Sequence, residues 1–267
     1  MTLLRFAANL TAMYGKLSLL DAMTAAKADG FDAFECRTPF DFPKEVVRDH
    51  AADLGLTFVQ FNCPMGNFAA GDRGLTCVPG REEEFRASIE KTIDYAMTLG
   101  VRQVNCVGGL RVQGAADDEI EEVMVRNLRY AAPRLADVGI KLQIEPINPL
   151  DTPGVFLTTT AQFRRIRERV AHPNLYLQYD FYHMQIVQGD LIRRYDELAD
   201  VISHVQVADN PGRHEPGTGE INYDFIFRTL EARGYGGWIG CEYAPSVTGP
   251  DSRTWLQNVG RSRTAVS

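Results

Sequence analysis

The sequence lacks the features that mark secreted, membrane-spanning or zinc-stabilised proteins. Its five cysteines are widely spaced and form no C-x-x-C pair, so neither a disulfide framework nor a structural zinc site is expected. No apolar run is long enough to cross a bilayer, and residues 1–15 contain no apolar segment of the kind found in signal peptides. These absences predict a cytoplasmic protein that keeps its thiols reduced and does not contact a membrane.

Positive charge is scarce as well. The formal net charge is −7 at pH 7, and the Lys and Arg residues form no basic stripe, which argues against a nucleic-acid partner. Only five histidines are present, whereas metal nucleases related to the DNA-repair barrels have His-rich sites. A small-molecule substrate is therefore expected, and individual arginines can still attract an anionic one. The sequence leaves open whether the chain forms a homo-oligomer.

The chain also lacks any Ser/Gly tract, Pro-rich run or charge block of linker length, so residues 1–267 are expected to form a single domain. Residues 260–267 are expected to be a short, irregular tail. Short β-type runs alternate with longer segments whose apolar residues recur at three- and four-residue spacing. The runs are Leu4–Asn9, Phe31–Glu35, Thr57–Asn62, Gln103–Val107, Lys141–Glu145, Leu175–Asp180, Ile202–Ala208 and Trp238–Glu242.

The longer segments predict helices, and several of them stop on a glycine directly before the next run. Glycine at such a position adopts the left-handed conformation that closes a helix. Repeated helix, glycine and strand indicates βα units, and eight strands in one domain fit a closed (β/α)₈ TIM barrel of the α/β class. No G-x-G-x-x-G follows the first strand, which removes the dinucleotide-binding alternative. The predicted helices include Leu17–Asp29, Glu82–Leu99, Asp118–Val138 and Tyr223–Arg233, and the glycines are Gly30, Gly55, Gly100, Gly139 and Gly234.

Four of the expected strands carry a metal-capable oxygen side chain at or near their C-terminal ends. Because the strands of a parallel barrel share one C-terminal mouth, residues far apart in sequence converge there. Three carboxylates and an amide at one rim would hold a hard divalent cation, Mg²⁺ or Mn²⁺ rather than zinc. The amide could equally be a hydrogen-bonded core residue. The four residues are Glu145, Asp180, Gln206 and Glu242.

This arrangement suggests a proton-transfer reaction. A cation on a carbonyl and its neighbouring hydroxyl acidifies the intervening C–H bond and stabilises an enediolate. Glu145 and Glu242 could face each other across the mouth, remove a proton from one carbon and return it to the next. An aldose–ketose type isomerase or an epimerase would use such a pair.

Further candidates lie near the expected mouth. His183, three residues after Asp180, could donate to a substrate oxygen or cap a short helix. Arg73 and Arg213 lie in Gly-rich loops and could bind a substrate carboxylate, because a guanidinium group supplies paired donors. Glu35, at the end of the second strand, could orient another ligand or pair with a nearby cation.

Five motifs in the C-terminal half, in order, resemble the hydroxypyruvate isomerase family of xylose-isomerase-like TIM barrels. The resemblance covers roughly residues 4–245 and includes Arg5–Leu10, Ala69–Gly74 and Pro79–Phe85 in the N-terminal half. The five motifs are Ile144–Asn148, Tyr179–Gln185, His204–Pro211, Glu215–Tyr223 and Gly236–Tyr243.

The resemblance implies interconversion of hydroxypyruvate and 2-hydroxy-3-oxopropanoate (tartronate semialdehyde). It implies Glu145 and Glu242 as the proton-transfer pair, and Mg²⁺ ligation by these two glutamates together with Asp180 and Gln206. A sister family, 2-oxo-tetronate isomerase, is similar across the same motifs. Two alternatives remain open: a ketose 3-epimerase on the same barrel, and a metal-dependent ligand-binding barrel without catalysis.

Overall fold

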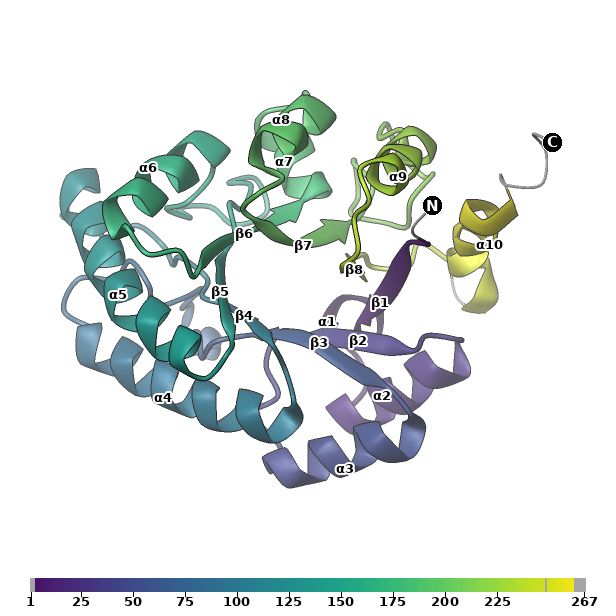
Figure 1. The fold of residues 1–267 in the computed structure, drawn as a ribbon, viewed down its shortest axis with the longest axis horizontal. Coiled ribbons are helices and arrows are strands. Elements are labelled where there is room, and N and C mark those ends of the chain that lie inside the picture. Colours follow the sequence, from purple (N-terminus) through teal and green to yellow (C-terminus); the bar gives the residue numbers. More distant parts are fainter. Residues whose placement is uncertain (1–2, 248, 262–267) are drawn as a thin grey trace.

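A computed structural model of the chain describes residues 3–247 and 249–261. Its strands are all parallel and hydrogen-bond in chain order, so that the last strand closes on the first (Figure 1). The expected closed barrel is thus confirmed as a single domain. The strands are β1 (Arg5–Asn9), β2 (Ala33–Cys36), β3 (Thr57–Asn62), β4 (Gln103–Asn105), β5 (Lys141–Ile144), β6 (Leu175–Asp180), β7 (Ile202–Val207) and β8 (Trp238–Cys241).

Helices connect successive strands and form the outer layer (Figure 1). The predicted helix Glu82–Leu99 is found with the same bounds, and the other three differ by one or two residues. The helices are α1 (Leu10–Met13), α2 (Leu19–Ala28), α3 (Lys44–Leu54), α4 (Glu82–Leu99), α5 (Asp117–Asp137), α6 (Thr160–Val170), α7 (Phe181–Val187), α8 (Leu191–Leu198), α9 (Tyr223–Ala232) and α10 (Thr254–Arg261), with 3₁₀ turns η1 (Phe68–Ala70) and η2 (Gly249–Arg253).

Two of the predicted glycines close their helices in the expected way. Gly55 after α3 and Gly100 after α4 have φ of 63° and 70°, and each donates its backbone N–H back into the last turn. This left-handed conformation is disfavoured for residues with a Cβ. The chain can therefore turn into the next strand within two residues after α3 and three after α4.

The C-terminal helix α10 packs against the barrel wall beside β1. Trp255 of α10 is buried and packs edge-on against Phe6 of β1 at 5.2 Å and parallel to Phe227 of α9 at 5.6 Å, measured between ring centroids. Residues 260 and 261, which were expected to belong to an irregular tail, are part of α10. The rest of that tail, residues 262–267, lies outside the described residues.

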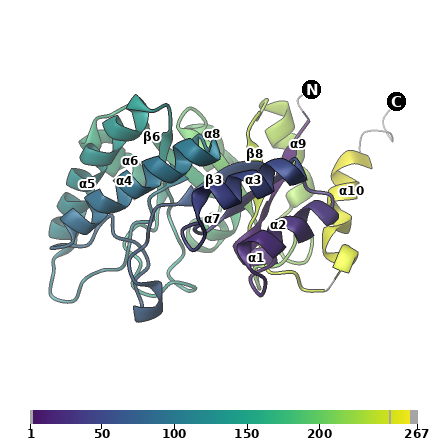
Figure 2. The ribbon, with the colours of Figure 1, turned by 90° about the horizontal axis from the view of Figure 1, so that it is seen from below.

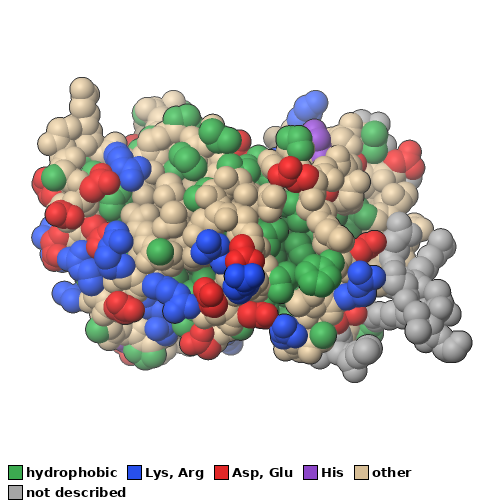
Figure 3. All heavy atoms as spheres, turned by 90° about the horizontal axis from the view of Figure 1, so that it is seen from above, with side chains coloured by type: hydrophobic (Ala, Val, Ile, Leu, Met, Phe, Trp, Pro, Cys, Tyr) green, Lys and Arg blue, Asp and Glu red, His purple; other side chains and the backbone are tan. Residues whose placement is uncertain are grey.

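Charges of both signs cover the outer helices. On the face in Figure 3, Lys and Arg side chains are interspersed with Asp and Glu. Ion pairs such as Arg165–Glu121 and Arg169–Glu122 join α6 to α5. Within the described ranges, no helix combines the length and the apolar character needed to cross a membrane.

We predict that Phe227→Ala lowers the free energy of unfolding by about 3–5 kcal/mol, because it leaves a cavity among packed aromatic rings. Phe227 is 4% exposed and contacts Phe6, Tyr223 and Trp255. Phe225→Ala on the same helix is the matched control, since Phe225 is 50% exposed and its loss should cost less than about 0.5 kcal/mol. Urea denaturation measures both; equal losses would contradict the packing described for α10.

Candidate active site

The barrel brings the predicted ligands to one end. Asp180 is the last residue of β6, Glu145 and Glu242 directly follow β5 and β8, and Gln206 lies in β7. Figure 2 shows α1 and α7, which begin where β1 and β6 end, on the same side of the barrel. This side is the C-terminal mouth, where barrel enzymes place their chemistry.

Asp180 and Glu145 each direct one oxygen into the mouth while the other is held by the protein. Asp180 caps α7, and its Oδ1 accepts a hydrogen bond from the Tyr182 amide at 2.8 Å. Glu145 Oε2 accepts from Asn105 Nδ2 at 3.0 Å and from Gln178 Nε2 at 2.8 Å. The remaining oxygens, Glu145 Oε1 and Asp180 Oδ2, are buried and have no hydrogen-bond partner among the described residues. Such atoms are expensive to leave unsatisfied, which indicates a ligand site.

His183 lies between these two carboxylates. Its Nε2 is 3.7 Å from Glu145 Oε1 and 3.6 Å from Asp180 Oδ2. Its Nδ1 accepts a hydrogen bond from Asn148 Nδ2 at 2.7 Å, and that amide is oriented because Asn148 Oδ1 accepts from two backbone N–H groups. The proton of a neutral His183 therefore resides on Nε2, so the side chain presents a donor to the mouth.

Arg213 connects Glu242, the third predicted carboxylate, to Asp180 and His183. Its Nη2 lies 3.2 Å from Glu242 Oε2, 3.8 Å from Asp180 Oδ2 and 3.5 Å from His183 Nε2. Arg213 follows a turn after β7 and has φ of 54°, a conformation that is uncommon outside glycine. One guanidinium group thus neutralises part of the negative charge of the cluster.

Burial is the largest cause of the pKa shifts in this cluster. Burial, followed by the charges of Glu242 and Asp180, raises the pKa of Glu145 well above its usual value, and burial also raises the pKa of Asp180. Burial raises the pKa of Glu242 to about 7, although Arg213 opposes the shift. Burial and the charge of Arg213 lower the pKa of His183. His183 is therefore neutral, and a carboxylate with a pKa near neutrality can act as acid or base.

Gln206 belongs to a polar network inside the barrel. Its Nε2 donates to Glu35 Oε1 at 2.6 Å, and its Oε1 accepts from Gln178 Nε2 at 2.6 Å. Glu35 also accepts from Asn9 and contacts His204 Nε2 at 2.6 Å. Burial alone would raise the pKa of Glu35, but His204 and these donors lower it below its usual value. Gln206 therefore links Glu35 to Gln178, which also hydrogen-bonds Glu145. Its side-chain oxygen is already engaged and does not point freely into the mouth.

Among the described residues, Arg73 forms no ion pair with the carboxylate cluster. Its guanidinium carbon is 4.0 Å from the centre of the Phe68 ring, and its Nη1 donates to the backbone oxygens of Phe68 and Asp72. Arg37, which the sequence suggested only as a possible partner of Glu35, lies 4.5 Å over the same ring. The structure thus brings together Glu145, Asp180, His183, Arg213 and Glu242, and leaves Arg73 in a second group at the rim.

Sequence reasoning missed the side chains that hold the others in place. Asn105 ends β4 and fixes Glu145, Asn148 fixes His183, and Gln178 joins Glu145 to Gln206. Gln178 stands two residues before Asp180 on β6, so both point to the same face of the strand. That spacing, in an otherwise apolar run, is a signal that could have identified Gln178.

The donor set fits a divalent cation. Glu145, Asp180 and His183 each offer an atom within 4.8 Å of the others. The two unpartnered carboxylate oxygens are the natural ligands, because hard cations prefer oxygen and the Nε2 of His183 carries a proton.

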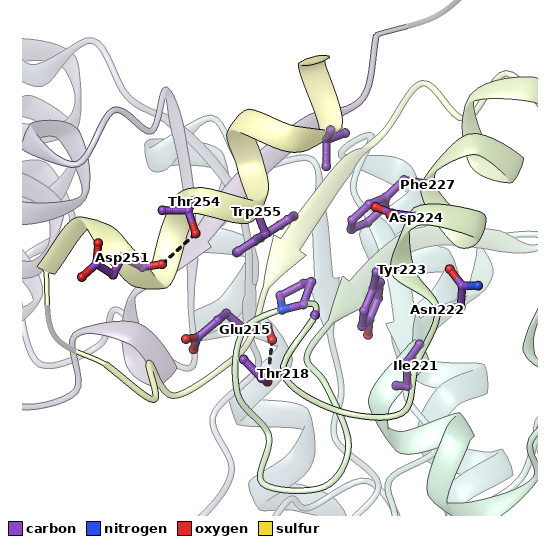
Figure 4. A pocket seen from close by; sticks show the side chains of 13 residues that line it. Glu215, Thr218, Ile221, Asn222, Tyr223, Asp224, Phe227, Asp251, Thr254 and Trp255 are labelled. Carbon is purple, nitrogen blue, oxygen red and sulfur yellow. Dashed lines mark hydrogen bonds between the residues drawn. The ribbon is translucent and has the colours of Figure 1, made fainter. Parts of the chain in front are cut away.

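The pocket in Figure 4 is separate from this cluster. It has a volume of about 420 Å³ and lies between the loop that follows β7 and the α10 helix, with Tyr223, Phe227 and Trp255 in its wall. None of the predicted site residues lines it. The predicted proton-transfer residues therefore lie in the charged mouth and not in this pocket.

Comparison with known proteins identifies relatives along most of the chain. Residues 23–263 match the family described as xylose isomerase-like TIM barrel. Hydroxypyruvate isomerase of Escherichia coli (strain K12) is 43% identical over 95% of this chain and 98% of its own, and 2-oxo-tetronate isomerase of Cupriavidus necator is 40% identical over 95% and 97%. The crystal structure of AP endonuclease, family 2 from Brucella melitensis superimposes with a TM-score of 0.91 at 38% identity, covering 95% of this chain and 98% of that one.

We predict that a divalent cation raises the melting temperature of this chain by roughly 5–10 °C at about 100 times its Kd. Glu145→Gln and Asp180→Asn should each abolish most of this shift. Glu215→Gln is the control, since Glu215 is also buried but hydrogen-bonds Ser246 outside the cluster. Differential scanning calorimetry measures the shift; an undiminished shift in both ligand variants would contradict the assignment.

The pH dependence of stability provides a separate test. The folded metal-free chain holds a proton on Glu242 up to about pH 7, whereas an ordinary glutamate releases it near 4.5. The unfolded chain thus binds fewer protons in this window, so the free energy of unfolding falls as pH rises from 4.5 to 7. Glu242→Gln should flatten this fall, and the cation should stabilise more at high pH, because its ligands must be deprotonated. Urea denaturation across this range tests both, and an unchanged slope in the variant would contradict the shift.

Proposed function

Because this chain belongs to the xylose isomerase-like TIM barrel family, we propose that it is the isomerase that interconverts hydroxypyruvate and 2-hydroxy-3-oxopropanoate. The activity is that of the E. coli relative, which is 43% identical along nearly the full length of both chains. The observation that carries the proposal is the pair of buried, unpartnered oxygens of Glu145 and Asp180 beside a neutral histidine and an arginine.

The proposed cofactor is Mg²⁺ or Mn²⁺, held by Glu145, Asp180 and Glu242 with Gln206 as the fourth ligand. The support for the first two is their free oxygens, and all-oxygen donor sets favour these metals over zinc. Gln206 would have to share an oxygen that now accepts from Gln178. When bound, the cation would polarise the substrate carbonyl and the neighbouring hydroxyl.

In the proposed reaction, Glu145 and Glu242 carry the proton between two carbons. One glutamate removes a proton from C3 of hydroxypyruvate, and the electron pair of that C–H bond forms the C2–C3 double bond of an enediolate. The other, in its protonated form, delivers a proton to C2, which leaves an aldehyde at C3 once O3 has lost its proton and O2 has gained one. In the metal-free chain, burial raises the pKa of Glu145 well above its usual value and that of Glu242 to about 7, so each can hold a proton under conditions in which an exposed glutamate is ionised.

His183 and Arg213 are proposed to bind substrate oxygens beside this pair. The Nε2–H of His183 faces the cluster, and His183 is buried, so it can donate to a developing oxyanion. Arg213 remains charged, because the neighbouring carboxylates outweigh the effect of burial and raise its pKa.

A second activity, 2-oxo-tetronate isomerisation, is supported by the Cupriavidus relative at 40% identity. The two substrates differ by one carbinol unit, which a pocket discriminates by only about 1–3 kcal/mol. We therefore expect activity on hydroxypyruvate to exceed activity on the four-carbon oxo acid by a modest factor. Assays of both substrates with EDTA, and with Mg²⁺ or Mn²⁺ added back, should show cation-dependent turnover. Metal-independent turnover would contradict the proposed cofactor.

We predict that turnover in deuterium oxide introduces solvent deuterium at C2 of the product, because a carboxylic acid exchanges its proton with water. Glu145→Gln and Glu242→Gln should each lower kcat by about 10²–10⁴-fold, whereas Glu215→Gln should not. Nuclear magnetic resonance of the product reports the label. Complete retention of the substrate hydrogen would indicate an internal hydride shift and contradict the two-glutamate scheme.

A further inference from the structure

Two arginines at the rim of the mouth share one aromatic ring. Arg37 directly follows β2, Arg73 lies in the loop between β3 and α4, and their guanidinium carbons are 4.5 Å and 4.0 Å from the centre of the Phe68 ring. Phe68 is 40% exposed, so the ring serves as a platform for the two cations rather than as part of the core.

Neither guanidinium group is neutralised by the protein. Within residues 3–247 and 249–261, no carboxylate forms an ion pair with Arg37 or Arg73, and the side chain of Arg37 makes no hydrogen bond. Burial is the main reason that the pKa of Arg37 lies below its usual value. The charge of Glu242 opposes this shift, and the charges of Arg73 and Arg213 add to it. Two guanidinium groups thus lie together with no ion-pair partner among the described residues, which favours an anionic ligand.

The platform is held in a fixed position. Asp72 accepts from the Asn67 amide at 2.6 Å and pairs with Arg81 at 2.8 Å, while Asn67 Oδ1 accepts from Ala70 at the end of η1. On the other side, Thr11 Oγ1 accepts from the Arg37 amide and the Asn62 amide donates to the Arg37 carbonyl, both at 2.9 Å. The loop and the end of β2 therefore present the two side chains with little freedom to lose on binding.

We propose that Arg37 and Arg73, stacked on Phe68, form the subsite that binds the substrate carboxylate and makes this enzyme specific for hydroxy-oxo acids over neutral ketoses. The inference rests on the proposed function for its substrate class. It adds Arg37 as a specificity residue and separates two roles: Arg213, which contacts Asp180 and Glu242, binds the reacting oxygens of the substrate, whereas Arg37 and Arg73 bind its carboxylate. Paired N–H donors on a planar group suit a carboxylate and offer no comparable advantage with a hydroxymethyl group.

The test compares an anionic and a neutral three-carbon probe, hydroxymalonate and dihydroxyacetone, by isothermal titration calorimetry in the presence of Mg²⁺. The native chain should bind hydroxymalonate more tightly. Arg37→Gln and Arg73→Gln should each weaken hydroxymalonate binding at least about tenfold, as expected for a lost charge-assisted hydrogen bond, and leave dihydroxyacetone binding nearly unchanged. Phe68→Leu should weaken hydroxymalonate binding by removing the platform. Unchanged melting temperatures would show that the variants are folded.

Arg86→Gln is the matched control, since Arg86 lies on α4, stacks on Tyr130 at 5.3 Å and pairs with Glu83. Wild-type-like hydroxymalonate binding by Arg37→Gln, equal losses for both probes, or no hydroxymalonate binding by the native chain would overturn the inference. Arginine-dependent binding without isomerase turnover would refute the proposed function alone. Turnover of hydroxypyruvate with arginine-independent binding would refute the subsite alone.

Discussion

The burial of three neighbouring carboxylates is the constraint on which the rest of this site depends. Glu145, Asp180 and Glu242 meet at the mouth of a closed barrel, where burial raises the pKa of each. Arg213 offsets part of this cost through its contacts with Asp180 and Glu242, but two buried oxygens remain without partners. Positive charge in the mouth, from a cation or from Arg213, is what allows the carboxylates to be ionised there.

The surrounding amide side chains hold these buried groups in a defined geometry. Asn105 and Gln178 hold one oxygen of Glu145, and Asn148 holds Nδ1 of His183. Each contact leaves a particular atom facing the mouth: a carboxylate oxygen in the first case and an Nε2–H donor in the second. Positioning of this kind lowers the reorganisation needed during a reaction, and it distinguishes the acid–base pair from the groups that bind substrate oxygens.

The barrel and the carboxylates could be predicted from the sequence, because both depend on local patterns. Alternating apolar runs and helix-closing glycines define the βα units, and the parallel barrel then requires the ends of β5, β6 and β8 to meet. The amide orientations could not be predicted, since Gln206 donates to Glu35 and accepts from Gln178 across three different strands. The position of Arg73 was also inaccessible, because it depends on the folded loop that carries Phe68. Loop tertiary contacts of this kind leave no periodic signal.

The most direct measurement of the central claim is anomalous diffraction from crystals of this chain grown with Mn²⁺. We expect a single strong peak within bonding distance of Glu145 Oε1 and Asp180 Oδ2, with Glu242 turned toward it and the guanidinium of Arg213 displaced from between the carboxylates. A mouth without such a peak, in which Arg213 still pairs with Asp180 and Glu242, would contradict it.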